Sequence, residues 1–157
     1  MSLHSIPTPF GTFVTEFSDL GLRSLAFPNQ RPVSADSGIA PEWFSLTQAA
    51  IHSVLEGKPI RRLPPLDLHQ GTDFQRSVWR QMLGIGLGQT RSYGEIARAL
   101  KKPGASRAVG SACGANPIPL LIPCHRVLAA NHRLGGFGGG LDWKRRLLAA
   151  EGIAVSS

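Results

Sequence analysis

Cysteine and histidine stand side by side in the stretch "NPIPLLIPCHRV" (116–127), where Cys124 follows a proline and precedes His125. A cysteine reacts as the thiolate, so its pKa of about 8.5 must be lowered or a nearby base must take its proton. Successive side chains of a strand point to opposite faces, so a regular strand here would need a water or a kink to connect the two groups. The alternative is that Cys124 is a small buried core residue.

A carboxylate that could orient such a histidine follows in "LDWKRRLLAAEG" (141–152). This stretch predicts a helix with Asp142 near its start and Gly152 at its C-cap, which puts Glu151 in the last turn. The helix dipole disfavours a carboxylate there by about 0.3–1 kcal/mol, so a role in a site would explain it, although many exposed glutamates have none. A Cys–His–Glu arrangement is compatible with transfer of a group to the cysteine and equally with a cysteine hydrolase.

Lysine and arginine exceed aspartate and glutamate by 17 to 10 in the 157 residues, a formal net charge of +7. An excess of this size on a small chain is typical of proteins that bind nucleic acid, and solubility alone is the other explanation. Apolar residues make up 42% of the chain, which indicates a globular protein rather than a disordered one.

The two cysteines, Cys113 and Cys124, are too few for a disulfide framework, although they could pair with each other in an oxidising compartment. The start "MSLHSIPTPFGTF" lacks the pattern of a secretory signal, and no run approaches the roughly 20 apolar residues of a membrane span. We therefore expect a cytoplasmic protein with reduced thiols and no membrane association. No pair of cysteines has the spacing of a zinc site, so no metal is expected.

The first 70 residues predict a small α/β unit. Residues 11–17 and 21–27 are β-forming runs joined by a short turn, which predicts a hairpin. A polar loop is expected over 28–38, and then a helix over 41–57 that carries its apolar residues on one face. The proline-rich stretch 58–71 predicts a linker with room for a short edge strand, and the domain boundary is placed there.

Helices with capping boxes are predicted after the linker. In "TDFQRSVWRQML" (72–83) Thr72 and Gln75 have the spacing of a capping box, as do Ser92 and Glu95 in "SYGEIARAL". "KKPG" then breaks the second of these helices, and "ASRAVGSACGAN" is helical until Pro117.

The two short helices around "KKPG" are a helix-turn-helix candidate. Because the second is made almost wholly of Ala, Gly and Ser, its close approach to another surface and tight packing on a neighbouring helix are equally good explanations. The basic residues around the pair are suited to contact phosphates: Arg91, Arg98, Lys101, Lys102 and Arg107.

These stretches resemble a known family. "NPIPLLIPCHRV", with "SYGEIARAL" and "SRAVG" before it and "GGFGGGL" and "LLAAEG" after it, closely resembles the O6-alkylguanine-DNA alkyltransferases (methylated-DNA–protein-cysteine methyltransferases). The resemblance is strong from about residue 72 to 153 and weak before it. It implies an α/β (α+β) fold in two domains: a small ribonuclease H-like domain over 1–68, and a winged helix-turn-helix-like alkyltransferase domain over 72–157.

The resemblance also implies catalytic roles. Cys124 corresponds to the acceptor that takes the alkyl group, His125 to its water-bridged base, and Glu151 to the acid that orients the histidine. Asn116 corresponds to the residue that stabilises the turn behind the site. Tyr93 corresponds to the hydroxyl that supports guanine as it leaves.

For DNA, the resemblance implies that Arg107 is the finger that enters the duplex where the target nucleotide is flipped out, at a cost of a few kcal/mol. Other residues are implied at the DNA surface, most of them small: Ala108, Gly110, Ser111, Ala112 and Arg126. The implied substrate pocket is formed by Tyr93, Val127, Phe137 and Gly138. The family commonly has tyrosine at Phe137 and in some members serine at Gly138, which bears on substrate preference rather than on the reaction.

The function so implied is removal of an alkyl group, mainly methyl, from O6 of guanine in double-stranded DNA. The group is transferred irreversibly to Cys124, once per molecule, by a monomer without cofactor or metal. A non-catalytic lesion sensor is the alternative, although such proteins have another residue in place of the cysteine. A plain helix-turn-helix regulator and a cysteine hydrolase are the remaining classes. The nearly uncharged second helix disfavours the regulator, and no oxyanion-hole motif supports the hydrolase.

Overall fold

The computed structural model describes residues 1–32, 36, 38 and 41–155. The chain divides into two compact units: unit 1 comprises residues 1–70 and 117–121, and unit 2 comprises residues 71–116 and those from 122 onward. Helices and strands occur in both, which confirms the mixed α/β class. Within the described residues, no helix has the length and apolar character needed to cross a membrane.

Unit 1 is built on an antiparallel sheet in the order β1-β2-β3. Its strands are β1 (Ser2–Thr8), β2 (Gly11–Ser18) and β3 (Gly21–Ala26). The predicted hairpin is confirmed as β2–β3. Strand β1 was missed, because its buried face presents His4 as well as Ile6 and because Pro7 argues against a strand. An edge strand tolerates proline, and β1 is at the edge of this sheet.

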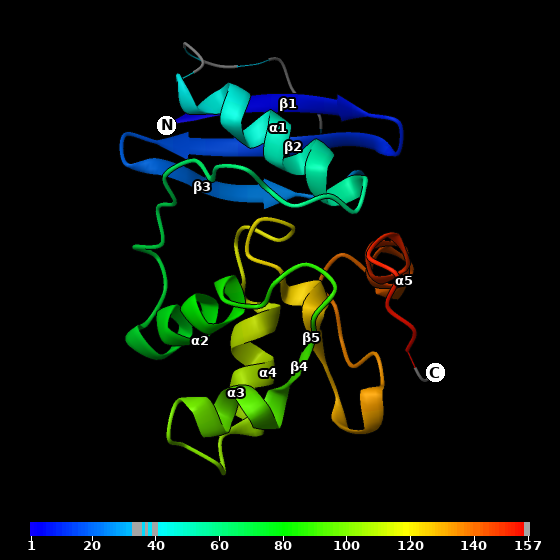
Figure 1. The fold of residues 1–157 in the computed structure, drawn as a ribbon. Helices are drawn as coiled ribbons and strands as arrows, with labels where there is room; N and C mark the ends of the chain where they lie inside the picture. Colours follow the sequence, from blue (N-terminus) through cyan, green and yellow to red (C-terminus); the bar gives the residue numbers. More distant parts are fainter. Residues whose placement is uncertain (33–35, 37, 39–40, 156–157) are drawn as a thin grey trace. The chain divides into compact units, whose positions relative to one another are not determined.

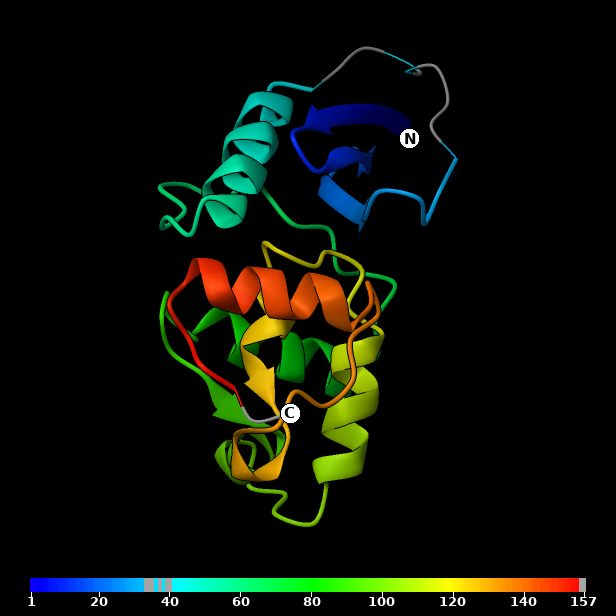
Figure 2. The same cartoon turned by 90° about the vertical axis from the view of Figure 1, so that its right-hand side faces the viewer.

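Helix α1 (Trp43–Leu55) packs across one face of this sheet (Figures 1 and 2). It confirms the helix predicted over 41–57, and its buried residues include Ile51 and Leu55. Phe44 lies with its ring centroid 5.5 Å from that of His4. The polar loop predicted over 28–38 includes residues 33–35 and 37, which lie outside the described residues.

The linker after α1 is attached to the edge of the sheet beside β3. The Leu22 N–H donates to the Pro65 carbonyl oxygen at 2.8 Å, and the Asp67 N–H donates to the Leu22 carbonyl oxygen at 2.8 Å. Leu22 and Leu66 therefore form a parallel bridge, which is the edge pairing that the linker had room for. Gly21 permits this approach, since a Cβ there would lie only 2.3 Å from the Pro65 oxygen.

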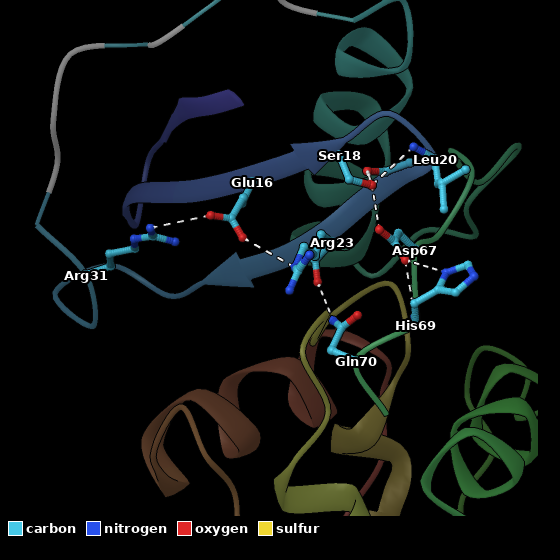
Figure 3. Close-up of polar contacts among 9 residues, drawn as sticks. Glu16, Ser18, Leu20, Arg23, Arg31, Asp67, His69 and Gln70 are labelled. Atoms are coloured by element: carbon cyan, nitrogen blue, oxygen red, sulfur yellow. Dashed lines mark hydrogen bonds and ion pairs between the residues drawn. The ribbon is translucent and has the colours of Figure 1, made fainter. Parts of the chain in front are cut away.

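The Asp67 carboxylate fixes the end of the linker (Figure 3). It is buried and accepts a hydrogen bond from the Ser18 hydroxyl at 2.5 Å. Its other oxygen lies 2.8 Å from His69 Nδ1 and accepts from the His69 N–H at 3.1 Å. The hydrogen bond from Ser18 and those from His69 lower the pKa of Asp67 against the opposing effect of burial.

Residues 117–121 belong to unit 1, although their neighbours in the sequence on both sides belong to unit 2. The Leu25 N–H of β3 donates to the Pro117 carbonyl oxygen at 2.9 Å, and Ile118 and Leu120 are buried. Nothing in the local pattern of this apolar run indicates that it packs with the first 70 residues.

Unit 2 contains four α-helices and a short parallel pair of strands among its described residues. The helices are α2 (Asp73–Leu83), α3 (Tyr93–Ala99), α4 (Ser106–Gly114) and α5 (Leu141–Ala150), and the strands are β4 (Arg91–Ser92) and β5 (Val127–Leu128). Two 3-10 turns, η1 (Cys124–Arg126) and η2 (Ala130–His132), flank β5. Both α2 and α3 pack against α4, and Figure 1 shows α3 and α4 joined by the predicted turn.

Local signals in the sequence set where these helices begin. The N–H of Gln75 donates to the Thr72 hydroxyl oxygen and the N–H of Glu95 to that of Ser92, both at 3.1 Å. The glutamine and glutamate side chains accept hydrogen bonds in return, so both predicted capping boxes are confirmed.

The excess of positive charge lies in unit 2 alone. Unit 1 contains five Lys and Arg against six Asp and Glu, and unit 2 contains twelve against four. The formal charges are therefore −1 and +8, which together give the +7 of the chain. Solubility would not require such a partition, whereas a nucleic-acid-binding surface on unit 2 would.

Candidate active site

Cys124 is the first residue of η1, directly after Pro123. The segment is therefore not a regular strand, and a kink brings the cysteine to the surface of a cavity. The Cys124 N–H donates to the Ile122 carbonyl oxygen at 2.7 Å. The Asn116 side-chain amide donates to the same oxygen at 2.8 Å, so it fixes the turn from behind.

Glu151 connects three groups at the end of α5. Its Oε2 lies 2.7 Å from His125 Nε2, and its Oε1 accepts from Arg126 Nε at 2.9 Å and from the Gly88 N–H at 2.9 Å. The Glu151 side chain is 1% exposed, although the residue is the C-cap of its helix. The unfavourable position on the helix is thus offset by three donors from other segments.

These contacts set the ionisation of the pair. Burial alone would raise the pKa of Glu151, but the hydrogen bonds from His125, Gly88 and Arg126 lower it to about 2. Burial lowers the pKa of His125 against the opposing effect of Glu151. An ionised Glu151 accepts from a neutral His125, which places the imidazole proton on Nε2 and leaves Nδ1 as an acceptor.

The acceptor nitrogen and the thiol are the two groups of the site that can exchange a proton. His125 Nδ1 is buried and has no hydrogen-bond partner among the described residues. Burial raises the pKa of Cys124 to about 11, against the effects of a hydrogen bond with Asn116 and the charge of Lys144. The resting thiol is therefore protonated at neutral pH, and its proton must leave when the sulfur attacks.

Cys124 opens into a cavity of about 120 Å³ within unit 2. This volume is below the roughly 300–1,000 Å³ of drug-sized ligand sites, so it suits one small group. The cavity is lined by Tyr93, Gly110, Cys113, Gly114, Cys124, Gly136, Phe137 and Gly138.

Tyr93 forms one wall of this cavity from the first position of α3. A Cβ on Gly135 would lie 2.7 Å from the Tyr93 hydroxyl, and Gly135 has a φ of +68°, so only glycine fits beside the ring. Burial is the largest cause that raises the pKa of Tyr93, which keeps the phenol protonated at neutral pH.

Comparison with known proteins decides the family. Residues 73–153 match the sequence model of the 6-O-methylguanine DNA methyltransferase, DNA binding domain. Methylated-DNA--protein-cysteine methyltransferase of Methanosarcina mazei is 36% identical over 96% of this chain and 97% of its own length. The chain belongs to the methylated-DNA–protein-cysteine methyltransferase family.

Other relatives show how far the similarity extends. The same-named protein of Mycolicibacterium paratuberculosis is 58% identical, but over 55% of this chain, and the match spans only about half (52%) of the relative's length. Among solved structures, Mycobacterium tuberculosis OGT in complex with DNA aligns with a TM-score of 0.81 and 39% identity, over 95% of this chain and 91% of that one. The resemblance read from the sequence is thus confirmed.

The structure brings the residues that the family resemblance assigns to catalysis into one region of unit 2. Cys124 and Tyr93 line the cavity, and Asn116 holds the turn behind it. His125 and Glu151 form the buried pair beside Cys124. Of the remaining assigned residues, Gly110, Phe137 and Gly138 line the cavity, and Arg107, Ala108 and Ser111 are exposed on α4.

Three assignments need correction. Arg126 was assigned to the DNA surface, but it is buried, pairs with Glu151 and donates to the Ile85 carbonyl oxygen at 2.7 Å, so it acts inside the protein. Ala112 was assigned to the same surface and is buried, with its carbonyl oxygen accepting from Trp79 Nε1 at 2.8 Å. Val127, assigned to the substrate pocket, is fully buried and is not among the residues that line the cavity.

Two residues at the cavity were missed. Cys113, to which the sequence analysis gave no place in the site, lines the cavity with Cys124. Lys144 is fully buried and donates to the carbonyl oxygen of Gly136, which lines the cavity, and to that of Val127. Neither carries a local signal, because a lysine in an amphipathic helix is expected to reach solvent and a free cysteine is expected to pack as a small core residue. In the described ranges, no three His, Cys, Asp or Glu side chains gather as metal ligands.

Proposed function

We propose that this protein repairs DNA by transferring an alkyl group, mainly methyl, from O6 of guanine to Cys124. The main observation in support is the small cavity that Cys124 lines, beside the buried His125–Glu151 pair. Support comes from relatives that are named methylated-DNA--protein-cysteine methyltransferase, one of them 39% identical over 94% of this chain.

The proposed reaction begins with proton transfer. In the proposed mechanism one water links the thiol to His125 Nδ1, which is buried and has no hydrogen-bond partner among the described residues. The thiol proton passes to Nδ1 as the sulfur attacks the sp³ carbon of the alkyl group, and Glu151 stabilises the imidazolium that forms. The carbon–sulfur bond forms while the bond between that carbon and O6 breaks.

Tyr93 assists the departure of guanine. Tyr93 lines the cavity, its hydroxyl gives its proton to the leaving base, and the proton held on His125 later restores the phenol. Every proton is thus accounted for without a cofactor. The product on Cys124 is a thioether, which has no leaving group that water could displace, so each molecule reacts once.

The proposed DNA surface is α4 and the turn before it. Arg107 is exposed in the first turn of α4, and Ala108 and Ser111 are exposed on the same helix. Small exposed residues let the helix backbone approach the duplex closely. A base that carries its lesion inside the stack must be flipped out before it can enter a cavity, and in this proposal Arg107 fills the gap that it leaves.

The intact mass of the protein after incubation with a duplex that contains O6-methylguanine tests the proposal. We expect each molecule to gain about 14 Da on Cys124 and the reaction to stop after one equivalent. Cys124→Ser should bind the lesion without any mass gain, since a hydroxyl is a much weaker nucleophile. Binding by the wild-type protein without a mass gain would identify a sensor instead, and repeated turnover would identify a hydrolase.

A further inference from the structure

We propose that Lys144 is a positioning residue that holds the wall of the alkyl-acceptor cavity in place. This inference rests on the proposed function for its consequence, but its structural part can be tested without alkyl transfer. Lys144 lies in the first half of α5, and its side chain is fully buried. A lysine in such a place must have its ammonium hydrogen bonded, because burial of an unpaired charge is very costly.

The ammonium group binds three backbone carbonyl oxygens. Nζ donates to Val127 at 2.7 Å, to Gly136 at 3.2 Å and to Leu134. Val127 begins β5, directly after the turn that carries Cys124, whereas Leu134 and Gly136 belong to the glycine-rich segment 134–138, of which Gly136, Phe137 and Gly138 line the cavity. One side chain therefore joins the two backbone segments that border the cavity.

These bonds also fix the direction of the peptide groups. The C=O and N–H of a planar trans peptide point in opposite directions. Holding the Leu134 and Gly136 carbonyls on Lys144 therefore orients the N–H groups of Gly135 and Phe137 away from it. Because glycine allows many backbone conformations, the segment 134–138 would otherwise lack a preferred arrangement.

The charge of Lys144 acts on the acceptor as well. Its ammonium lowers the pKa of Cys124, while burial lowers its own pKa to about 8. A methionine of similar length would remove both the three hydrogen bonds and the charge. An arginine would keep a charge and donors, but its planar fork cannot meet three carbonyls that converge on one point.

Hydrogen exchange of the native full chain tests the positioning role directly. In Lys144→Met we expect the amides of residues 134–138 to exchange at least about tenfold faster than in the wild type, while those of α2 stay unchanged. Lys58→Met is the matched control, because Lys58 is exposed in unit 1 and its loss changes the net charge equally. Unchanged exchange over 134–138 in folded Lys144→Met would overturn the proposal.

Reaction with free O6-benzylguanine gives the functional readout. Lys144→Met should require a higher half-saturating concentration and react at least about tenfold more slowly at low concentration, and Lys144→Arg should recover part of the loss. Wild-type kinetics in Lys144→Met would overturn the proposal.

If the wild type itself takes up no alkyl group, the proposed function fails, whereas the exchange comparison still decides the role of Lys144. Should Lys144→Met not fold, Lys144→Arg replaces it, with faster exchange over 134–138 expected and unchanged exchange contradicting the proposal.

Discussion

At the scale of single residues, Glu151 organises the site. Its carboxylate accepts hydrogen bonds from a histidine, an arginine and a backbone N–H, and its side chain is almost wholly buried. His125 is held in one tautomer by this carboxylate, so its other ring nitrogen, Nδ1, is the one that can take a proton. A substitution at Glu151 therefore affects both reactivity and stability.

Glu151→Gln should slow alkyl transfer at least about tenfold, because the base loses its ionic partner. It should also lower the free energy of unfolding by about 3 kcal/mol at neutral pH, since Arg126 keeps a buried charge without a counter-charge. Single-turnover kinetics and urea titration measure the two effects. Asp142→Asn, an exposed acid on the same helix, is the control and should change neither. Wild-type kinetics in Glu151→Gln would remove the carboxylate from the mechanism.

The stability effect should depend on pH in a defined direction. The pKa of Glu151 is about 2 in the folded protein against an ordinary value of 4.5, so its contribution is present above pH 4.5 and is lost as the pH falls toward 2. The difference in unfolding free energy between wild type and Glu151→Gln should therefore shrink between pH 6 and pH 3. Urea titrations across this range measure it, and a constant difference would contradict the assigned ionisation.

At the scale of elements, α4 carries the proposed contact with the duplex. Arg107→Ala should weaken repair of O6-methylguanine in duplex DNA far more than reaction with free O6-benzylguanine, because the free base has no unstacking cost to offset. Arg61→Ala in unit 1 is the matched control, since Arg61 is also exposed and its loss removes the same charge. Equal losses on both substrates in Arg107→Ala would exclude the finger role.

The linker is the second element with a specific anchor. Asp67→Asn should lower the free energy of unfolding by about 1–3 kcal/mol, because the buried group loses charge-assisted hydrogen bonds from Ser18 and His69. Asp19→Asn, an exposed acid in the neighbouring β2–β3 turn, should change it by less than about 0.5 kcal/mol. Chemical denaturation of both variants measures the difference. Equal stability of the two would show that Asp67 does not anchor the linker.

At the scale of the whole molecule, the partition of charge predicts how DNA binding responds to salt. With +8 on unit 2, affinity for undamaged duplex should fall steeply and linearly on logarithmic axes as salt rises. If Lys102 contacts a phosphate, Lys102→Ala should make the slope of log affinity against log salt concentration shallower by about one. Lys58→Ala should leave this slope unchanged. Fluorescence anisotropy between low and physiological salt measures the slope. A flat dependence would assign the charge to solubility.

Local patterns in the sequence determined several helix starts, one hairpin and the family of this protein. The capping boxes at Thr72 and Ser92 begin their helices as expected, because they depend on contacts only three residues apart. The same holds for the hairpin β2–β3, whose strands are adjacent in the chain. The stretch around Cys124 indicated the family, because the residues of its motif are contiguous in the sequence.

Only the tertiary structure decided the rest, because burial and pairing between distant segments leave no local pattern. Arg126, which the family resemblance assigned to the DNA surface, and Lys144, for which the sequence predicted no role, are both turned inward by hydrogen bonds to other segments of the chain. His125 reaches Glu151 across 26 residues. Residues 117–121 pack with unit 1 because their apolar side chains are buried there, a choice that depends on surfaces formed by other parts of the chain.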